Sequence, residues 1–148
     1  MSTSLPYRYH VRLVSRGEDA ILTDDVKPPI VGGAPPEFGG SGAWWSPEHL
    51  LLSAISLCFA ATFRAFASRA AVLVHEFTSE VDGVLERRAG EFVFASIELR
   101  VSTRVADGQA ELTERLLQSA KRHCIVANAL KAPVGLTTAV TVEEALPA

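Results

Sequence analysis

The side chains of this sequence best suited to covalent chemistry are its two cysteines, Cys58 and Cys124. A cysteine thiolate is a nucleophile, and two cysteines within reach of each other form a reversible disulfide. Cys58 stands in the apolar run from Ile55 to Ala60, where a cysteine is more often a small buried hydrophobic residue. Cys124 follows Lys121-Arg122-His123, whose cations favour a thiolate, whereas a helix carboxyl end disfavours one. Local context alone therefore favours a plain structural interpretation for both.

The amino-terminal third is predicted to form a short hairpin followed by a long loop. Alternation of apolar and polar residues predicts a strand over Tyr7–Val14, and a turn at Arg16-Gly17-Glu18-Asp19 leads to a return strand at Ala20–Thr23. Four prolines and five glycines between Val26 and Trp45 predict a long ordered loop, which in a compact domain is often a lid or a binding loop.

A long helix is predicted to carry Cys58. Ser46-Pro47-Glu48 is a good helix start, because serine caps the first amides, proline suits the first turn and glutamate complements the helix dipole. The helix is expected to run to about Arg69. It is apolar on nearly every side through Phe63, and the run from Leu50 to Phe63 is shorter than a bilayer requires, so we expect a buried core helix.

The second half predicts two long strands, a helix and a final strand. The ranges are Val72–Leu85, Glu91–Val105, Ala110–His123 with Cys124 at its end, and Val134–Val142. This order predicts an α+β domain in which a long central helix lies on an antiparallel sheet.

Composition indicates one globular domain over residues 1–148 in the cytoplasm. The chain is 48% hydrophobic and 21% charged, and its net charge of −3 gives no reason to expect nucleic acid or an anionic membrane as a partner. No apolar signal core opens the sequence, so secretion by that route is not expected. In a reducing compartment two cysteines are more often free thiols or a redox couple than a structural disulfide.

Other catalytic patterns are weak. The four histidines form no metal motif, and the glycine pairs do not stand between a strand and a helix as phosphate-binding loops do. No serine lies in a nucleophile elbow. We therefore expect no cofactor and no metal.

Two motifs resemble those of the OsmC/Ohr family, the osmotically inducible and organic hydroperoxide resistance proteins. The segment from Ser46 to Phe59 resembles the start of the family's central helix with its peroxidatic cysteine at the position of Cys58. The segment from Ala120 to Asn128 resembles the family's resolving-cysteine segment, with Cys124 as the resolving cysteine. The predicted order of elements also resembles that fold over the whole chain.

The resemblance implies an organic hydroperoxide reductase with four site residues. Cys58 would attack the peroxide, Cys124 would resolve the sulfenic acid, and a dithiol, in the best-known branch a dihydrolipoyl protein, would supply electrons. The family's activating arginine falls on Arg16 when the chain is aligned without gaps from Pro47-Glu48, and Glu48 would hold it as an ion-pair partner. Arg8 and Arg12 are rivals, and Arg16 as a solvated turn charge stays open.

Spacing along the helix also predicts a homodimer. Glu48 and Cys58 are ten positions apart, which is about 15 Å along a straight helix and on different faces. Two antiparallel central helices related by a twofold axis would place Glu48 of one copy near Cys58 of the other. The resemblance likewise implies an intertwined homodimer with composite sites.

Departures from the family pattern keep other functions open. Cys124 is followed by Ile125 where the hydroperoxide-resistance branch commonly has proline, and Trp44-Trp45 replaces small residues. Trp44, Trp45, Phe59 and Phe63 are candidates for an apolar substrate lining, and equally for plain core or interface residues. The alternative function is a dimeric hydrophobic-ligand-binding or redox-sensing protein; a structural disulfide is disfavoured.

Overall fold

The structure, a computed structural model of the 148-residue chain, describes residues 5–144. The chain forms two compact units, Met1–Leu51 and Leu52–Ala148, and the division falls within the long helix α1 (Pro47–Arg69). The expectation of a single domain over residues 1–148 stays a prediction.

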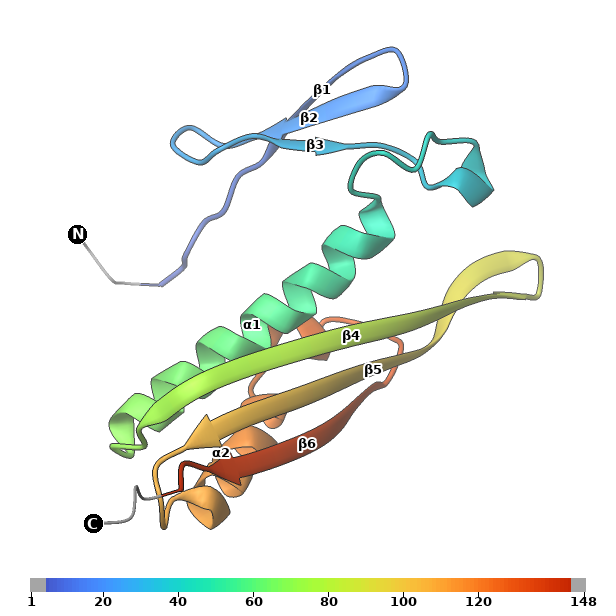
Figure 1. The fold of residues 1–148 in the computed structure, drawn as a ribbon. Coiled ribbons are helices and arrows are strands. Elements are labelled where there is room, and N and C mark those ends of the chain that lie inside the picture. The colour runs from blue at the N-terminus through green and yellow to red at the C-terminus, as the bar shows by residue number, and fades with distance from the viewer. Residues whose placement is uncertain (1–4, 145–148) are drawn as a thin grey trace. The chain divides into compact units, whose positions relative to one another are not determined.

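The first unit holds a three-stranded antiparallel sheet of β1 (Arg12–Arg16), β2 (Asp19–Thr23) and β3 (Ile30–Gly32) (Figure 1). The predicted turn between β1 and β2 is confirmed, and Gly17 takes the positive φ of 84° that the tight reversal requires.

Two features of this unit differ from the prediction. The first strand begins at Arg12 rather than Tyr7, because Arg12 pairs with Thr23, where β2 ends. The predicted loop contains β3 and a short 3-10 helix, η1 (Pro36–Phe38). A strand of three residues is too short to give a recognisable alternation.

The second unit holds β4 (Val74–Arg88), β5 (Glu91–Val105) and β6 (Val134–Val142) in the order β4-β5-β6. β4 and β5 form the predicted antiparallel hairpin, but β6 runs parallel to β5, so the prediction of an antiparallel sheet is wrong for this strand. The reason is the crossover: α2 (Ala110–Arg122) and α3 (Ile125–Asn128) return the chain to the start of β5 before β6 begins.

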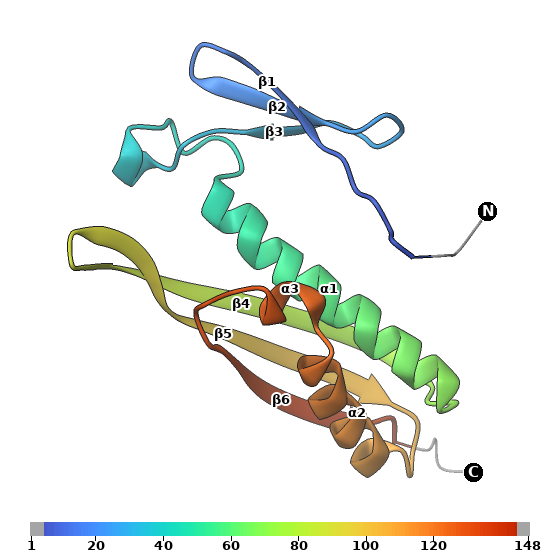
Figure 2. The same ribbon diagram turned by 180° about the vertical axis from the view of Figure 1, so that it is seen from behind.

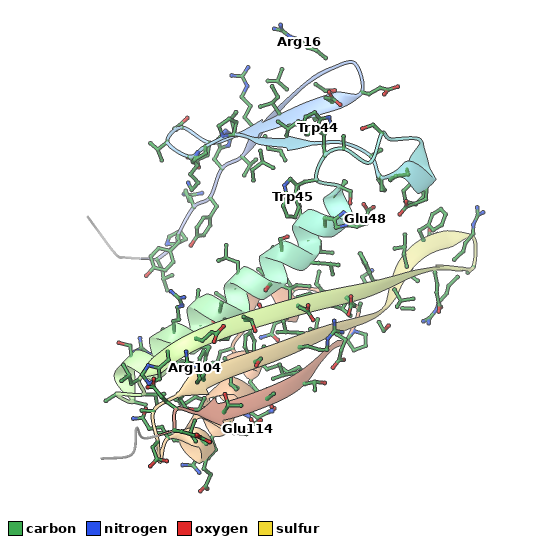
Figure 3. The ribbon with its side chains drawn as sticks, in the orientation of Figure 1. Arg16, Trp44, Trp45, Glu48, Arg104 and Glu114 are labelled. Atoms are coloured by element: carbon green, nitrogen blue, oxygen red, sulfur yellow. The ribbon has the colours of Figure 1, made fainter. Side chains whose placement is uncertain are left out.

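The carboxyl-terminal part of α1 and helix α2 cover the same face of this sheet (Figures 1 and 2). The inward alternation predicted for β5 is confirmed at Ile97, Leu99 and Val101, which are at most 3% exposed. Thr138 of β6 donates a hydrogen bond of 2.6 Å to Glu114 of α2, which ties the helix to the strand beneath it (Figure 3).

Helix α1 begins as predicted, with Ser46 accepting a hydrogen bond of 3.2 Å from the His49 amide. The helix has 23 residues and a most apolar window of mean hydropathy 1.8, so length and composition alone would allow it to cross a bilayer. The predicted burial on nearly every side is not met within the described chain, where one stripe of α1 is buried: Ile55, Phe59, Phe63 and Ala67. Only 22% of the apolar window is buried in this way.

Candidate functional site

Cys58 lies at the edge of the buried stripe of α1. It is half-buried and packs against the hydrophobic core of the second unit, next in sequence to the fully buried Phe59. Its carbonyl accepts a hydrogen bond of 2.9 Å from the Thr62 hydroxyl, one turn further along the helix. The helix therefore holds the Cys58 side chain at the boundary between core and surface.

Cys124 lies in the elbow between α2 and α3 and is 1% exposed. α2 ends at Arg122, so Cys124 is the residue before α3 and not the end of α2 as predicted. Its Sγ is 4.0 Å from the carbonyl oxygen of Ile55, at hydrogen-bond distance for sulfur. Because Ile55 lies one helical turn before Cys58, this contact seats Cys124 against the turn of α1 that carries Cys58.

The Cys58 thiol influences the pKa of the Cys124 thiol. Burial is the main cause that raises the pKa of the Cys124 thiol above its ordinary value of 9.0. The amide of Ala127 acts in the opposite direction, and the hydrogen bond with the Cys58 thiol raises the pKa further. The cations that precede Cys124 in sequence are not among these main influences. At neutral pH Cys124 is therefore a protonated thiol beside Cys58.

This arrangement can form and break a disulfide. Both cysteines are free thiols in the structure, one half-buried and one buried. An oxidant that reaches the more exposed Cys58 produces an electrophilic sulfur within reach of the Cys124 thiol, and a disulfide follows. The residues next to each cysteine in sequence did not indicate this pairing.

The structure does not join Arg16 to Glu48. Arg16 is the last residue of β1 and is exposed beside the turn, while Glu48 lies in the first turn of α1. Figure 3 shows the two side chains well apart, and among residues 5–144 no ion pair connects them. Arg16 pairs with Asp19 at the turn between β1 and β2. Arg8 and Arg12 are exposed too, so exposure does not separate the three arginines.

One carboxylate oxygen of Glu48, Oε2, is buried without a hydrogen-bond donor in the described part of the chain. A buried carboxylate oxygen without a donor is costly, so this atom is suited to accept a hydrogen bond from a further group.

The aromatic residues divide into two groups. Phe59 and Phe63 are 1% and 0% exposed and stack against Phe77, so they are core residues and not a substrate lining. Trp44 and Trp45 are 46% and 54% exposed. The Trp45 carbonyl accepts a hydrogen bond of 3.0 Å from the Gly33 amide, which ties the start of α1 to the end of β3.

Two features of the site region were not singled out in the sequence. The first is the Ile55 carbonyl against Cys124, which only the tertiary structure reveals. The second is a cavity of about 550 Å³ beside the elbow, lined in part by Lys121, Arg122 and Lys131. Its sequence signal is the complete absence of aspartate and glutamate between Glu114 and Glu143.

In the described range 5–144, no group of three or more histidine, cysteine, aspartate or glutamate side chains is arranged to hold a metal ion.

The comparison of this sequence with protein-family models decides the family. The OsmC-like protein family matches residues 40–139, which include Glu48, Cys58 and Cys124. The chain belongs to the OsmC-like family. No curated protein sequence matches it.

Solved structures agree on this OsmC-like fold. An OsmC-like protein of unknown function from Vibrio cholerae is 17% identical, with a TM-score of 0.82 over 90% of this chain and 100% of that chain. An organic hydroperoxide resistance protein from Legionella pneumophila is 19% identical, with a TM-score of 0.70 over 94% and 100%. Another from Elizabethkingia anophelis, with bound thiocyanate, is 17% identical, with a TM-score of 0.69 over 94% and 100%. At these identities the likeness establishes the fold alone.

Proposed function

We propose that this OsmC-like protein is a cytoplasmic thiol peroxidase that reduces organic hydroperoxides through Cys58 and Cys124. The observation that carries the proposal is that Cys124, a buried thiol, packs against the turn of α1 that carries the half-buried thiol of Cys58. Family membership supports it, since two structural neighbours are organic hydroperoxide resistance proteins.

The proposed reaction balances with a dithiol as reductant. The Cys58 thiolate attacks one peroxide oxygen, the O–O bond breaks, and the alkoxide leaves as an alcohol after taking a proton. Cys58 becomes a sulfenic acid. The Cys124 thiol attacks its sulfur, water leaves, and a disulfide remains. A dithiol, in one form a dihydrolipoyl group, then returns two electrons and two protons.

Burial supports the proposed roles of the two cysteines. Cys58 is the more exposed thiol, so peroxide reaches it first, whereas Cys124 is 1% exposed and has a raised pKa. A resolving cysteine must reach only the neighbouring sulfur. The half-buried position of Cys58 against the apolar core favours alkyl peroxides over hydrogen peroxide, because the alkyl group gains apolar contact.

Arg16 and Glu48 complete the proposed site in a homodimer. A guanidinium beside Cys58 would stabilise its thiolate and donate hydrogen bonds to the peroxide. The buried, unpartnered Glu48 Oε2 supports a cation at that position, and a second copy of the chain is the proposed source of Arg16. The apolar surface of α1, most of it uncovered within one chain, supports this dimer.

The test is consumption of cumene hydroperoxide and hydrogen peroxide by the reduced protein with a dithiol in excess. We expect turnover that prefers the organic peroxide and is abolished by Cys58→Ser. We expect Arg16→Gln to lower kcat/KM about 100-fold. Arg12→Gln, which removes the same charge from the other end of β1, is the matched control and should change it less than about twofold.

The outcome that overturns the proposal is equal inertness of wild type and Cys58→Ser with every peroxide. A dimeric protein that binds a hydrophobic ligand, or senses oxidants without turnover, would then be the better account. Loss of activity in Arg12→Gln instead of Arg16→Gln would make Arg12 the activating arginine and would leave the rest of the proposal unchanged.

A further inference from the structure

The elbow between α2 and α3 is bordered by a cavity of about 550 Å³ whose charged lining residues are all cations. Lys121 and Arg122 line it from the end of α2, Asn128 from α3, and Lys131 from the segment before β6. A volume of this size is typical of a binding site. We call these residues, with Ile125, the basic elbow.

The basic elbow is positively charged, whereas the protein as a whole carries a net negative charge. The net charge of the chain is −3, yet the sequence between Glu114 and Glu143 contains arginine and lysine and no acidic residue. Arg115, in this same stretch, is paired with Glu111 at 2.6 Å. None of the ion pairs in the described part of the chain involves the three cations of the cavity. Their charge is therefore available to a ligand.

An exposed apolar side chain accompanies these cations. Ile125 is 78% exposed, in the first position of α3. It lies three positions before Asn128, so both side chains stand on the same side of the short helix. An apolar residue among charges of one sign is typical of a protein-binding surface, where an apolar contact is surrounded by a polar rim.

The basic elbow lies directly around Cys124. Cavity-lining residues occur within four positions on both sides of it, at Lys121 and Arg122 before it and at Ala127 and Asn128 after it. A partner held by these side chains is therefore held beside the segment that contributes half of the proposed disulfide.

We propose that the basic elbow docks an acidic protein that carries the dithiol reductant of this enzyme, an inference that rests on the proposed function. Complementary charge steers such a partner to the elbow and raises its association rate. One thiolate of its dithiol attacks the more exposed sulfur, Cys58, and the Cys124 thiol is released. The second thiol of the partner then displaces Cys58 and closes the partner's own disulfide, so that two electrons and two protons pass to the enzyme.

The test uses two synthetic peptides, each carrying one dihydrolipoyl-lysine, flanked by glutamates in one and by glutamines in the other. The enzyme disulfide is prepared with diamide, a thiol oxidant, so that no peroxide chemistry is required. The second-order rate constant for its reduction is then measured at low ionic strength. We expect the glutamate peptide to react about tenfold faster, and the advantage to vanish at about 0.5 M salt.

Two variants locate the effect. Lys121→Glu combined with Lys131→Glu should abolish the advantage of the glutamate peptide, while Arg115→Glu, outside the cavity, should retain it. Equal rates for both peptides with the wild type would overturn the proposal. So would an advantage that survives the double substitution, or one that Arg115→Glu removes equally, because net charge would then explain it.

A binding measurement separates this inference from the proposed function. Fluorescently labelled versions of the two peptides without the dithiol are titrated with reduced protein, and anisotropy gives the Kd. Tighter binding of the glutamate peptide, lost in the Lys121→Glu and Lys131→Glu double variant, would support docking even if no peroxide were consumed. Equal binding of both peptides would overturn docking even if the enzyme were fully active.

Discussion

The Sγ of Cys124 lies 4.0 Å from the carbonyl oxygen of Ile55, one helical turn before Cys58, although Cys58 is in the middle of α1 and Cys124 in the elbow between α2 and α3. Their environments differ: Cys58 is half-buried, whereas Cys124 is buried against the carbonyl of Ile55. With two neighbouring thiols of unequal exposure, the more exposed thiol can attack the peroxide and the buried thiol can resolve the sulfenic acid.

Alkylation should distinguish the two thiols. We expect limiting iodoacetamide at about pH 8 to modify Cys58 at least about tenfold faster than Cys124, because burial and a raised pKa both protect Cys124. Peptide mass spectrometry over a time course measures the two rates. In denaturant the rates should converge, which serves as the control. Faster modification of Cys124 in the folded protein would contradict the assigned roles.

Burial of the Cys124 thiol should make stability depend on alkaline pH. Its pKa is raised in the folded state, so the unfolded chain loses this proton first as the pH rises. The contribution to the free energy of unfolding is present below the ordinary value of 9.0 and is lost as the pH rises through the folded pKa. Urea unfolding of the reduced protein should therefore show a steeper alkaline loss of stability for wild type than for Cys124→Ala. Parallel curves for the two proteins would contradict this prediction.

The sequence predicted long regular elements well. The ranges expected for β5 and β6 agree with the structure, and α2 differs by one residue, because alternation and helical periodicity persist over many positions. The direction of β6 was wrong, since a strand's own pattern does not contain the path of the crossover. β3 was missed because its three residues form no detectable period.

The site was predictable only in part. The local sequence around Cys58 and around Cys124 favoured unreactive structural residues. Only the resemblance to a family indicated that the two cysteines form a pair. The residues that meet in the fold, such as Ile55 and Cys124, are far apart in sequence, and no local pattern indicates that contact. The expected ion pair between Arg16 and Glu48 is absent from the described chain, in which Arg16 lies exposed at the turn of its hairpin.

Gln109 should stabilise the connection from α1 to β4. Its side chain accepts a hydrogen bond of 2.8 Å from the Leu73 amide and donates one of 3.1 Å to the Ala71 carbonyl. Ala71 has a positive φ of 54°, an unfavourable conformation for alanine that such bonds help to maintain. We expect Gln109→Ala to lower the free energy of unfolding by about 1–2 kcal/mol.

Chemical denaturation of the reduced protein measures the effect of Gln109→Ala. The matched control is Gln118→Ala on the exposed side of α2, where the amide donates a single bond of 3.2 Å to Glu114. That substitution should change the free energy of unfolding by less than about 0.5 kcal/mol. Equal effects at the two positions would show that the hydrogen bonds of Gln109 to Ala71 and Leu73 add no extra stability to the fold.

Leu57 should report on the proposed homodimer. It lies in α1 beside Cys58, and 73% of it is exposed within one chain, in a helix that is otherwise suited to burial. We expect wild type to sediment as a dimer at micromolar concentration and Leu57→Glu to shift it towards monomer, because a charge would be buried in the interface. Leu73→Glu, at a leucine that is 58% exposed outside α1, is the control. A monomeric wild type would refute the dimer.

The central claim is that peroxide converts Cys58 and Cys124 into a disulfide through Cys58. The direct measurement is intact-protein and peptide mass spectrometry after one equivalent of cumene hydroperoxide is added to the reduced protein. We expect the loss of two hydrogens and a single peptide pair linked through Cys58 and Cys124. Cys124→Ser should accumulate a sulfenic acid on Cys58, and Cys58→Ser should remain unmodified. An unmodified wild type, or oxidation of Cys124 in the Cys58→Ser variant at the wild-type rate, would contradict the account.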